Sequence, residues 1–284
     1  MLPGERGANV WERAKIPELR HYCDLLASAS AKLLPGTRLA ADVVHLAEQA
    51  DALVPNRAAP LLVKGRALSV LGQHAAAITA LTEARARDDR ALEEPMALLA
   101  WARAHVATGD RVTARAAYRE LLPRADTLPL ADRGVAYLGA GMLVMAEGPA
   151  SLDEAIAILR QARRDSQDLL RAAATYVLAL ALSRAGDASE ATAVLTEEGI
   201  LEADHVMTDL RVLDAMMPGS PNGALEAHAV NALALEGLGK QDVARAAWRA
   251  YLDGGAAGGV WDAHARAHAG PASKGGPTPP ARHP

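Results

Sequence analysis

Two histidines near the C-terminal end have the spacing that comes nearest to a metal site. His264 and His268 are four positions apart in the segment WDAHARAH, and Asp262 lies beside them. Two histidines at i and i+4 on one helix can both be zinc ligands. No third ligand is clearly placed, no HExxH motif occurs, and the only cysteine is Cys23, so a cysteine-based metal site is impossible. We therefore expect a solvated helix here, with no metal and no cofactor.

Motifs for phosphate binding and nucleophilic catalysis are missing from the sequence. LEGLGK contains a Gly-Lys pair but lacks the glycine five residues upstream that a phosphate-binding loop requires. GSPNG around Ser220 lacks the flanking pattern of a nucleophile elbow. Carboxylates such as Asp153, Glu154 and Glu197 stand near expected turns, where they favour helix starts or solvent. We expect the protein not to be an enzyme.

Two arginines occupy equivalent places in similar segments, Arg66 in LLVKGRALS and Arg103 in LLAWARAHV. A guanidinium group binds a carboxylate through paired, charge-assisted hydrogen bonds. If the two segments stack side by side, both arginines could contact one carboxylate or acidic segment of a binding partner. The alternative is that both are solvated and cover apolar surface with their aliphatic stems.

The elements that position these arginines are expected to be helices. Half of the 284 residues are apolar, aromatic residues make up 3%, and phenylalanine is absent, so the core must consist mainly of Ala, Leu and Val. Alanine has the highest helix propensity, and its small side chain lets helices approach closely. This composition predicts an all-α protein, and it suggests a GC-rich bacterial genome.

One stretch, ALSVLGQHAAAITALTEARARD, shows how the helices are arranged. Gly72 is expected just past the end of a first helix, because glycine tolerates the left-handed conformation of a turn. Ala77, Leu81 and Ala84 then follow the i, i+4, i+7 spacing of a second helix that folds back. Gly65 and Ala77 are small enough for the two helices to pack closely. The stretch predicts a helical hairpin.

The same spacing recurs along the chain. Turn glycines precede the equivalent stripes in ATGDRVTARAAYRELL, RAGDASEATAVL and GLGKQDVARAAW, and EGPASLDEAIAILRQARRD carries a few extra residues in its turn. The first residue of each stripe is Val43, Ala77, Ala114, Ala155, Ala191 or Ala244. This pattern resembles the tetratricopeptide repeat (TPR). Trp101, Tyr118 and Trp248 fall at or near its packing positions, so we expect them in the core.

The resemblance implies a right-handed superhelical α-solenoid of about six TPR-like helix-turn-helix repeats, with a C-terminal capping helix and a disordered tail. A partly disordered N-terminal segment (1–16) would precede the solenoid (17–256), which has an extra helical insertion near 200–222. A short helix within 257–270 and a disordered, Pro- and Gly-rich tail (271–284) would follow it. The approximate repeats are 24–57, 58–91, 95–128, 132–169, 172–205 and 225–256.

Such repeats stack around a concave groove lined by the first helices, and this groove binds a peptide or a helix of another protein. We therefore predict a non-catalytic scaffold or adaptor. The partner-binding positions given by the repeat pattern are Leu62, Arg66, Ser69, Leu99, Arg103, Val106, Tyr176, Leu180 and Ser183. The lysine and asparagine set by which other members bind chaperones is not found in this sequence.

Charge and hydropathy bear on the partner and the compartment. The net charge is −4 and the pI about 6.1, which disfavours nucleic acid as a partner. The N-terminal residues lack the apolar region of a signal peptide, and no apolar run reaches the ~18 residues of a membrane span. We expect a cytoplasmic protein, and we make no prediction of its oligomeric state. The alternative, a pilotin-like assembly factor of the bacterial envelope, would require an export signal removed before Met1.

Overall fold

The computed structural model of the chain describes residues 17–33, 39–197 and 223–270. The regular structure of these residues is helical, and they contain no strand, so the predicted all-α class is confirmed. The α-helices are α2 (Pro17–Lys32), α3 (Ala40–Leu53), α4 (Ala58–Val70), α5 (His74–Arg87), α6 (Pro95–Ala107), α7 (Arg111–Leu121), α8 (Leu130–Met145), α9 (Leu152–Arg164), α10 (Asp168–Arg184), α11 (Ala188–Glu197), α13 (Gly223–Gly237), α14 (Gln241–Tyr251) and α15 (Asp262–Ala269).

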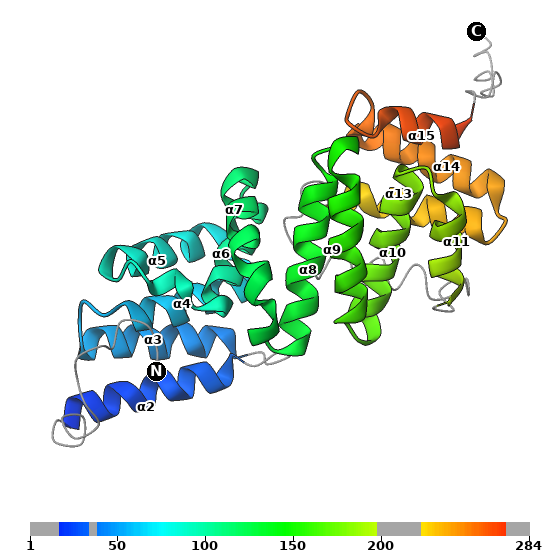
Figure 1. Cartoon of the computed structure of the whole chain (residues 1–284). Coiled ribbons are helices and arrows are strands. Elements are labelled where there is room, and N and C mark those ends of the chain that lie inside the picture. Colours follow the sequence, from blue (N-terminus) through cyan, green and yellow to red (C-terminus); the bar gives the residue numbers. More distant parts are fainter. Residues whose placement is uncertain (1–16, 34–38, 198–222, 271–284) are drawn as a thin grey trace, which may run out of the picture.

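Successive helices pair into hairpins, in which a second helix folds back on a first helix (Figure 1). The pairs are α2–α3, α4–α5, α6–α7, α8–α9, α10–α11 and α13–α14. They stack from α2 at one end of an elongated molecule to α15 at the other, as an α-solenoid. The residues that begin each predicted stripe are no more than 1% exposed: Val43, Ala77, Ala114, Ala155, Ala191 and Ala244.

The turns inside the hairpins repeat one backbone geometry. Gly72 has a φ of 72°, and the equivalent Gly109, Gly186 and Gly239 also have positive φ. The residue after Gly72 donates its N–H to the Leu68 carbonyl at 2.9 Å, a six-residue bond that ends the first helix. The same bond follows the other three glycines. The prediction that glycine makes these turns is confirmed.

Glycine also sets the distance between the two helices of a hairpin. A Cβ atom on Gly65 would lie 2.5 Å from Cγ of Leu81, and one on Gly141 would lie 2.6 Å from Cγ of Leu159. Both leucines are fully buried in the second helix. A larger residue at either glycine would therefore push the paired helices apart.

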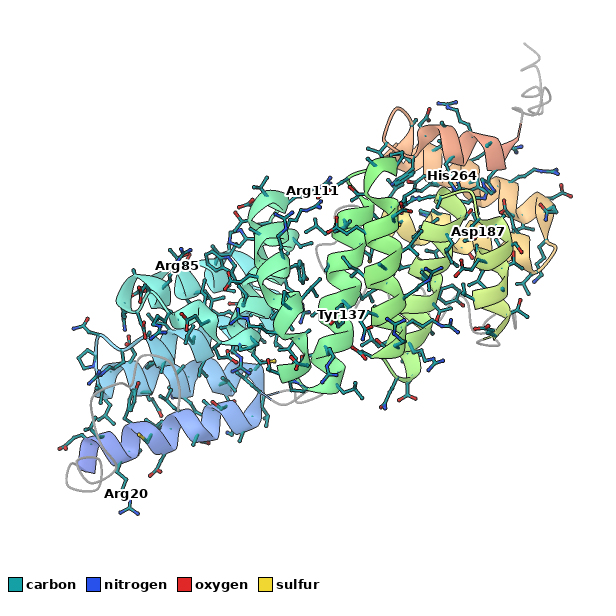
Figure 2. The ribbon with its side chains drawn as sticks, viewed as in Figure 1. Arg20, Arg85, Arg111, Tyr137, Asp187 and His264 are labelled. Carbon is teal, nitrogen blue, oxygen red and sulfur yellow. The ribbon has the colours of Figure 1, made fainter. Side chains whose placement is uncertain are left out.

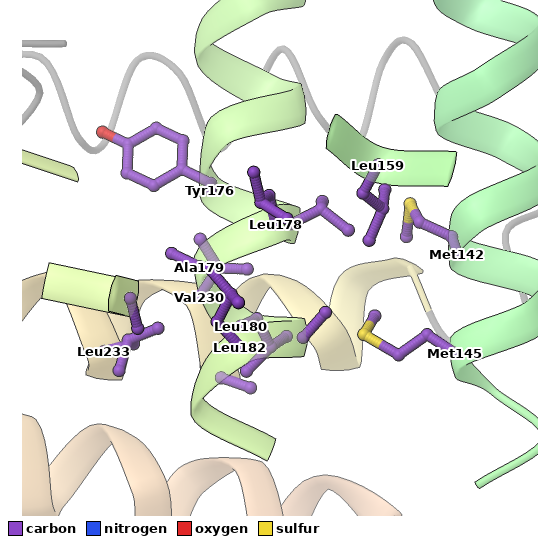
Figure 3. Close-up of a cluster of buried hydrophobic side chains, with 14 of the residues drawn as sticks. Met142, Met145, Leu159, Tyr176, Leu178, Ala179, Leu180, Leu182, Val230 and Leu233 are labelled. Carbon is purple, nitrogen blue, oxygen red and sulfur yellow. The ribbon is translucent and has the colours of Figure 1, made fainter. Parts of the chain in front are cut away.

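The largest core lies between the fourth and sixth hairpins, around α10. This helix is apolar on almost every side, because α8 and α9 cover one side and α11 and α13 cover another. Its buried side chains meet those of α8, α9 and α13 in the cluster shown in Figure 3. Tyr118 and Trp248 are also buried, as predicted, whereas Trp101 is half-buried.

Ion pairs connect the second helices on the outer side of the solenoid. Arg115 of α7 contacts Glu154 of α9 at 3.1 Å and also pairs with Glu147. Arg160 and Arg163 of α9 contact Glu190 and Glu197 of α11. Glu154 and Glu197, two of the carboxylates expected near turns, thus bridge neighbouring hairpins.

A buried arginine joins the fifth hairpin to the sixth. Arg184, at the end of α10, donates from Nη2 to Glu226 of α13 at 2.7 Å and to the Tyr251 hydroxyl of α14 at 3.1 Å. Its Cζ lies 4.5 Å from the ring centroid of Trp261, just before α15. Only 1% of the Arg184 side chain is exposed, so the ion pair is shielded from water.

The end of the solenoid carries α15, which packs on α14 within the stretch where a capping helix is expected. The predicted N-terminal segment, the insertion near 200–222 and the tail 271–284 lie outside the described residues. Among the helices that are described, none has the length and apolar character needed to cross a membrane.

Candidate functional site

Most of the predicted partner-binding residues are packed between helices. Leu62 and Leu99 are each 2% exposed, because α6 packs over the former and α8 over the latter. Tyr176 and Leu180 belong to the core around α10 (Figure 3). The prediction that these residues line an open groove is wrong, because neighbouring hairpins cover them. It is also wrong for the buried Ser69 and Ser183.

Arg66, Arg103 and Val106 are only half-buried. They lie on first helices of neighbouring hairpins, and we call the surface formed by α4, α6 and α8 around the two arginines the first-helix face. Arg66 is partnered there, because its Nη1 lies 3.9 Å from Oε2 of Glu94. Glu94 also caps α6 by accepting hydrogen bonds from the N–H groups of Met96 and Ala97.

Asp132, in the first turn of α8, brings a second carboxylate to this face. Burial raises the pKa of Asp132, while the positive charges of Arg103 and Arg66 act in the opposite direction. Its Oδ2 is buried and accepts no hydrogen bond within the part of the chain that the structure describes. Three consecutive hairpins thus bring two guanidinium groups and one incompletely satisfied carboxylate within electrostatic range of one another.

Arg103 differs from Arg66 because it makes no hydrogen bond or ion pair with another described residue. It acts at longer range on groups around it. Burial lowers the pKa of His74, and the positive charge of Arg103 lowers it further. Burial raises the pKa of Tyr118 to about 12, and the charge of Arg103 opposes this shift. A guanidinium group has five N–H donors, so Arg103 can bind an acceptor from outside the chain.

Sequence reasoning missed Glu94 and Asp132, the acidic half of the first-helix face. Each stands at or just after the start of a first helix, where a carboxylate is usually explained by capping or by the helix dipole. The signal that could have found them is their position one hairpin after each arginine. This signal can be recognised only when the packing of each first helix against the next is known.

The two histidines of α15 face other protein groups. Their ring centroids are 4.6 Å apart. Nδ1 of His268 lies 2.9 Å and 3.0 Å from the two carboxylate oxygens of Glu236, which also accepts a hydrogen bond from Nε1 of Trp248 at 2.8 Å. His264 packs edge-on against Trp248. Among the described residues, no three His, Cys, Asp or Glu side chains are grouped so that they could hold a metal ion.

Comparison with known proteins adds little to this geometry. No protein-family model matches the chain, and no curated protein matches it. Among solved structures, one titled "Structure of Naa15/Naa10 bound to HypK-THB" is similar over 84% of this chain, with 16% sequence identity and a TM-score of 0.39. The chain spans 37% of that chain's length. The helices themselves show an all-α solenoid of stacked helical hairpins.

Proposed function

We propose that the protein is a non-catalytic scaffold that binds a segment of another protein on the first-helix face. The observation that supports this proposal is Arg103, a half-buried guanidinium group with no direct partner among the described residues. An acceptor supplied by a partner, such as an acidic side chain, would satisfy it. The partner need not displace Glu94, which is already bound to Arg66 and to the start of α6.

Asp132 limits the positive charge that this face offers. Its carboxylate lies within electrostatic range of Arg103 and Arg66, and its Oδ2 is buried, so the bound segment would contact the arginines and not this oxygen. The alternative role at the bacterial envelope stays a prediction from the sequence, because no described residue favours it.

The experiment is affinity capture from the native host, with quantitative mass spectrometry of the bound proteins. We expect the double variant Arg66→Ala/Arg103→Ala to lose partners that the unmodified protein retains. The matched control is Arg160→Ala/Arg163→Ala, which removes two arginines from the outer side of α9. If the first-helix variant captures the same partners as the unmodified protein, while circular dichroism shows both to be folded, this binding face is wrong.

A further inference from the structure

Residues of α14, α15 and the end of α13 line a pocket of about 780 Å³. In Figure 1, α14 and α15 lie at the opposite end of the molecule from α4 and α6, which carry the two arginines of the first-helix face. The residues of this C-terminal pocket that bear on its chemistry are Gln241, Arg245, Arg249, Glu236, His268 and Gly270. His264, labelled in Figure 2, lies one turn before His268 on α15 but does not line the pocket.

The polar side chains from α14 form a row along one side of the pocket. Gln241, Arg245 and Arg249 are spaced i, i+4, i+8, so they lie on the same face of the helix. With a rise of 1.5 Å per residue, the row extends over about 12 Å, and the two arginines are about 6 Å apart along the axis. Two guanidinium groups at this spacing can both donate to one oxyanion or to neighbouring oxyanions.

The carboxylate in the pocket is bound by His268 and Trp248, so most N–H donors of the two arginines have no acceptor among the described residues. Glu236 is bound on both oxygens by His268 and on one by Trp248. Arg249 has one hydrogen bond, from Nη2 to the Ala269 carbonyl at 3.3 Å, and this bond does not neutralise its charge. Among the described residues, Arg245 forms an ion pair only with Asp242, and 96% of the Asp242 side chain is exposed. An exposed ion pair of this kind contributes little to the free energy of folding, so a bound anion could replace Asp242 at low cost.

We propose that the C-terminal pocket binds a small molecule that carries two or more phosphate or carboxylate groups. Arg245 and Arg249 would hold the anionic groups, and Gln241 would donate from its amide. The volume lies within the range typical of small-molecule sites and is far larger than a single phosphate ion needs. This proposal goes beyond the protein-binding role and uses none of its residues.

The test is isothermal titration calorimetry of the full chain with inorganic phosphate, pyrophosphate and citrate, at constant ionic strength. We expect pyrophosphate or citrate to bind more tightly than phosphate, because each can contact both arginines. Stronger binding of pyrophosphate would assign a phosphorylated ligand, and stronger binding of citrate a carboxylated one. Arg245→Gln and Arg249→Gln should each weaken binding about tenfold or more, as expected for a lost charge-assisted hydrogen bond.

Two further variants separate binding from folding. Arg249→Lys keeps the charge but loses the planar fork, so it should weaken binding less than Arg249→Gln does. Arg119→Gln removes an exposed arginine from α7 and should leave binding unchanged. The proposal is overturned if no probe binds the folded protein with a Kd below about 10 mM. It is equally overturned if binding survives in both glutamine variants, since the anion would then bind elsewhere.

Discussion

Ion pairs of the same chemical type should differ in how much their loss destabilises the protein, because they differ in burial. Arg184 and Arg160 both form arginine–glutamate pairs between neighbouring hairpins, at 2.7 Å and 2.5 Å. The Arg184 side chain is 1% exposed, whereas that of Arg160 is 45% exposed. Water and salt screen the outer pair, but removing one partner of the inner pair would leave a carboxylate in a poorly hydrated place.

Arg184→Met should therefore destabilise the protein by about 3–5 kcal/mol, because Glu226 would lose its counter-charge. Arg160→Met, the matched control, should cost less than about 1 kcal/mol. Urea unfolding followed by tryptophan fluorescence measures both. The double variant Arg184→Met/Glu226→Gln should recover part of the loss. If it is less stable than Arg184→Met, the uncompensated carboxylate does not cause the effect.

Gly65→Ala should destabilise the second hairpin by about 1–3 kcal/mol, since the added methyl group would overlap Leu81. Gly237→Ala is the control, for which we expect no loss of stability. This glycine is exposed at the end of α13, and alanine there should be neutral or stabilising by up to about 1 kcal/mol. Thermal unfolding followed by circular dichroism compares them. Equal effects of the two substitutions would argue against the close approach of α4 and α5.

At the scale of helices, the sequence alone predicts those features that depend on residues close together in the chain. Turn glycines and the stripe of Ala77, Leu81 and Ala84 depend on neighbours a few residues away, so the hairpins could be predicted. Exposure of the first helices depends on how one hairpin covers the next, and the repeat pattern does not contain that information. Leu62 and Leu180 were misplaced for this reason, whereas the long, polar Arg66 and Arg103 stayed partly accessible.

The attachment of α15 should depend on pH through His264. Burial, followed by the positive charges of His268 and Arg184, lowers the pKa of His264 from 6.5 to about 4. Glu236, Glu226 and Tyr251 are the other ionisable groups around these partners. A detached α15 would have a histidine of ordinary pKa, so the docked form binds fewer protons. Docking is then fully favourable above pH 6.5 and weakens as the pH falls from 6.5 towards 4.

Hydrogen–deuterium exchange of residues 262–269, after correction for the intrinsic pH dependence of exchange, measures this effect. We expect protection to decrease between pH 7 and pH 5. His264→Gln should reduce the dependence on pH, because glutamine does not titrate. An unchanged slope would exclude His264 as its source.

At the scale of the whole molecule, each hairpin packs mainly on its immediate neighbours. Separate cores join α2 to α4, α4 to α6, α6 to α8 and α8 to α15. Stability in such an array is a sum of local terms, so a defect should spread only a short distance. The large core around α10 makes the C-terminal half the more cooperative part.

We therefore expect Gly65→Ala to increase hydrogen exchange in α2–α7 and to leave α13–α15 unchanged. Arg184→Met should show the opposite distribution, with faster exchange in α13–α15. Exchange resolved by peptide mass spectrometry distinguishes the two patterns. Uniform loss of protection over all helices in either variant would show that the solenoid unfolds as a single unit.

The Arg184–Glu226 pair has a consequence for protein engineering. It fixes α13 against α10 through side chains of two hairpins. A chimera that exchanges α13–α15 for the end of another solenoid must therefore keep Glu226 or replace Arg184 as well, because either charge alone would lack its partner in a poorly hydrated place.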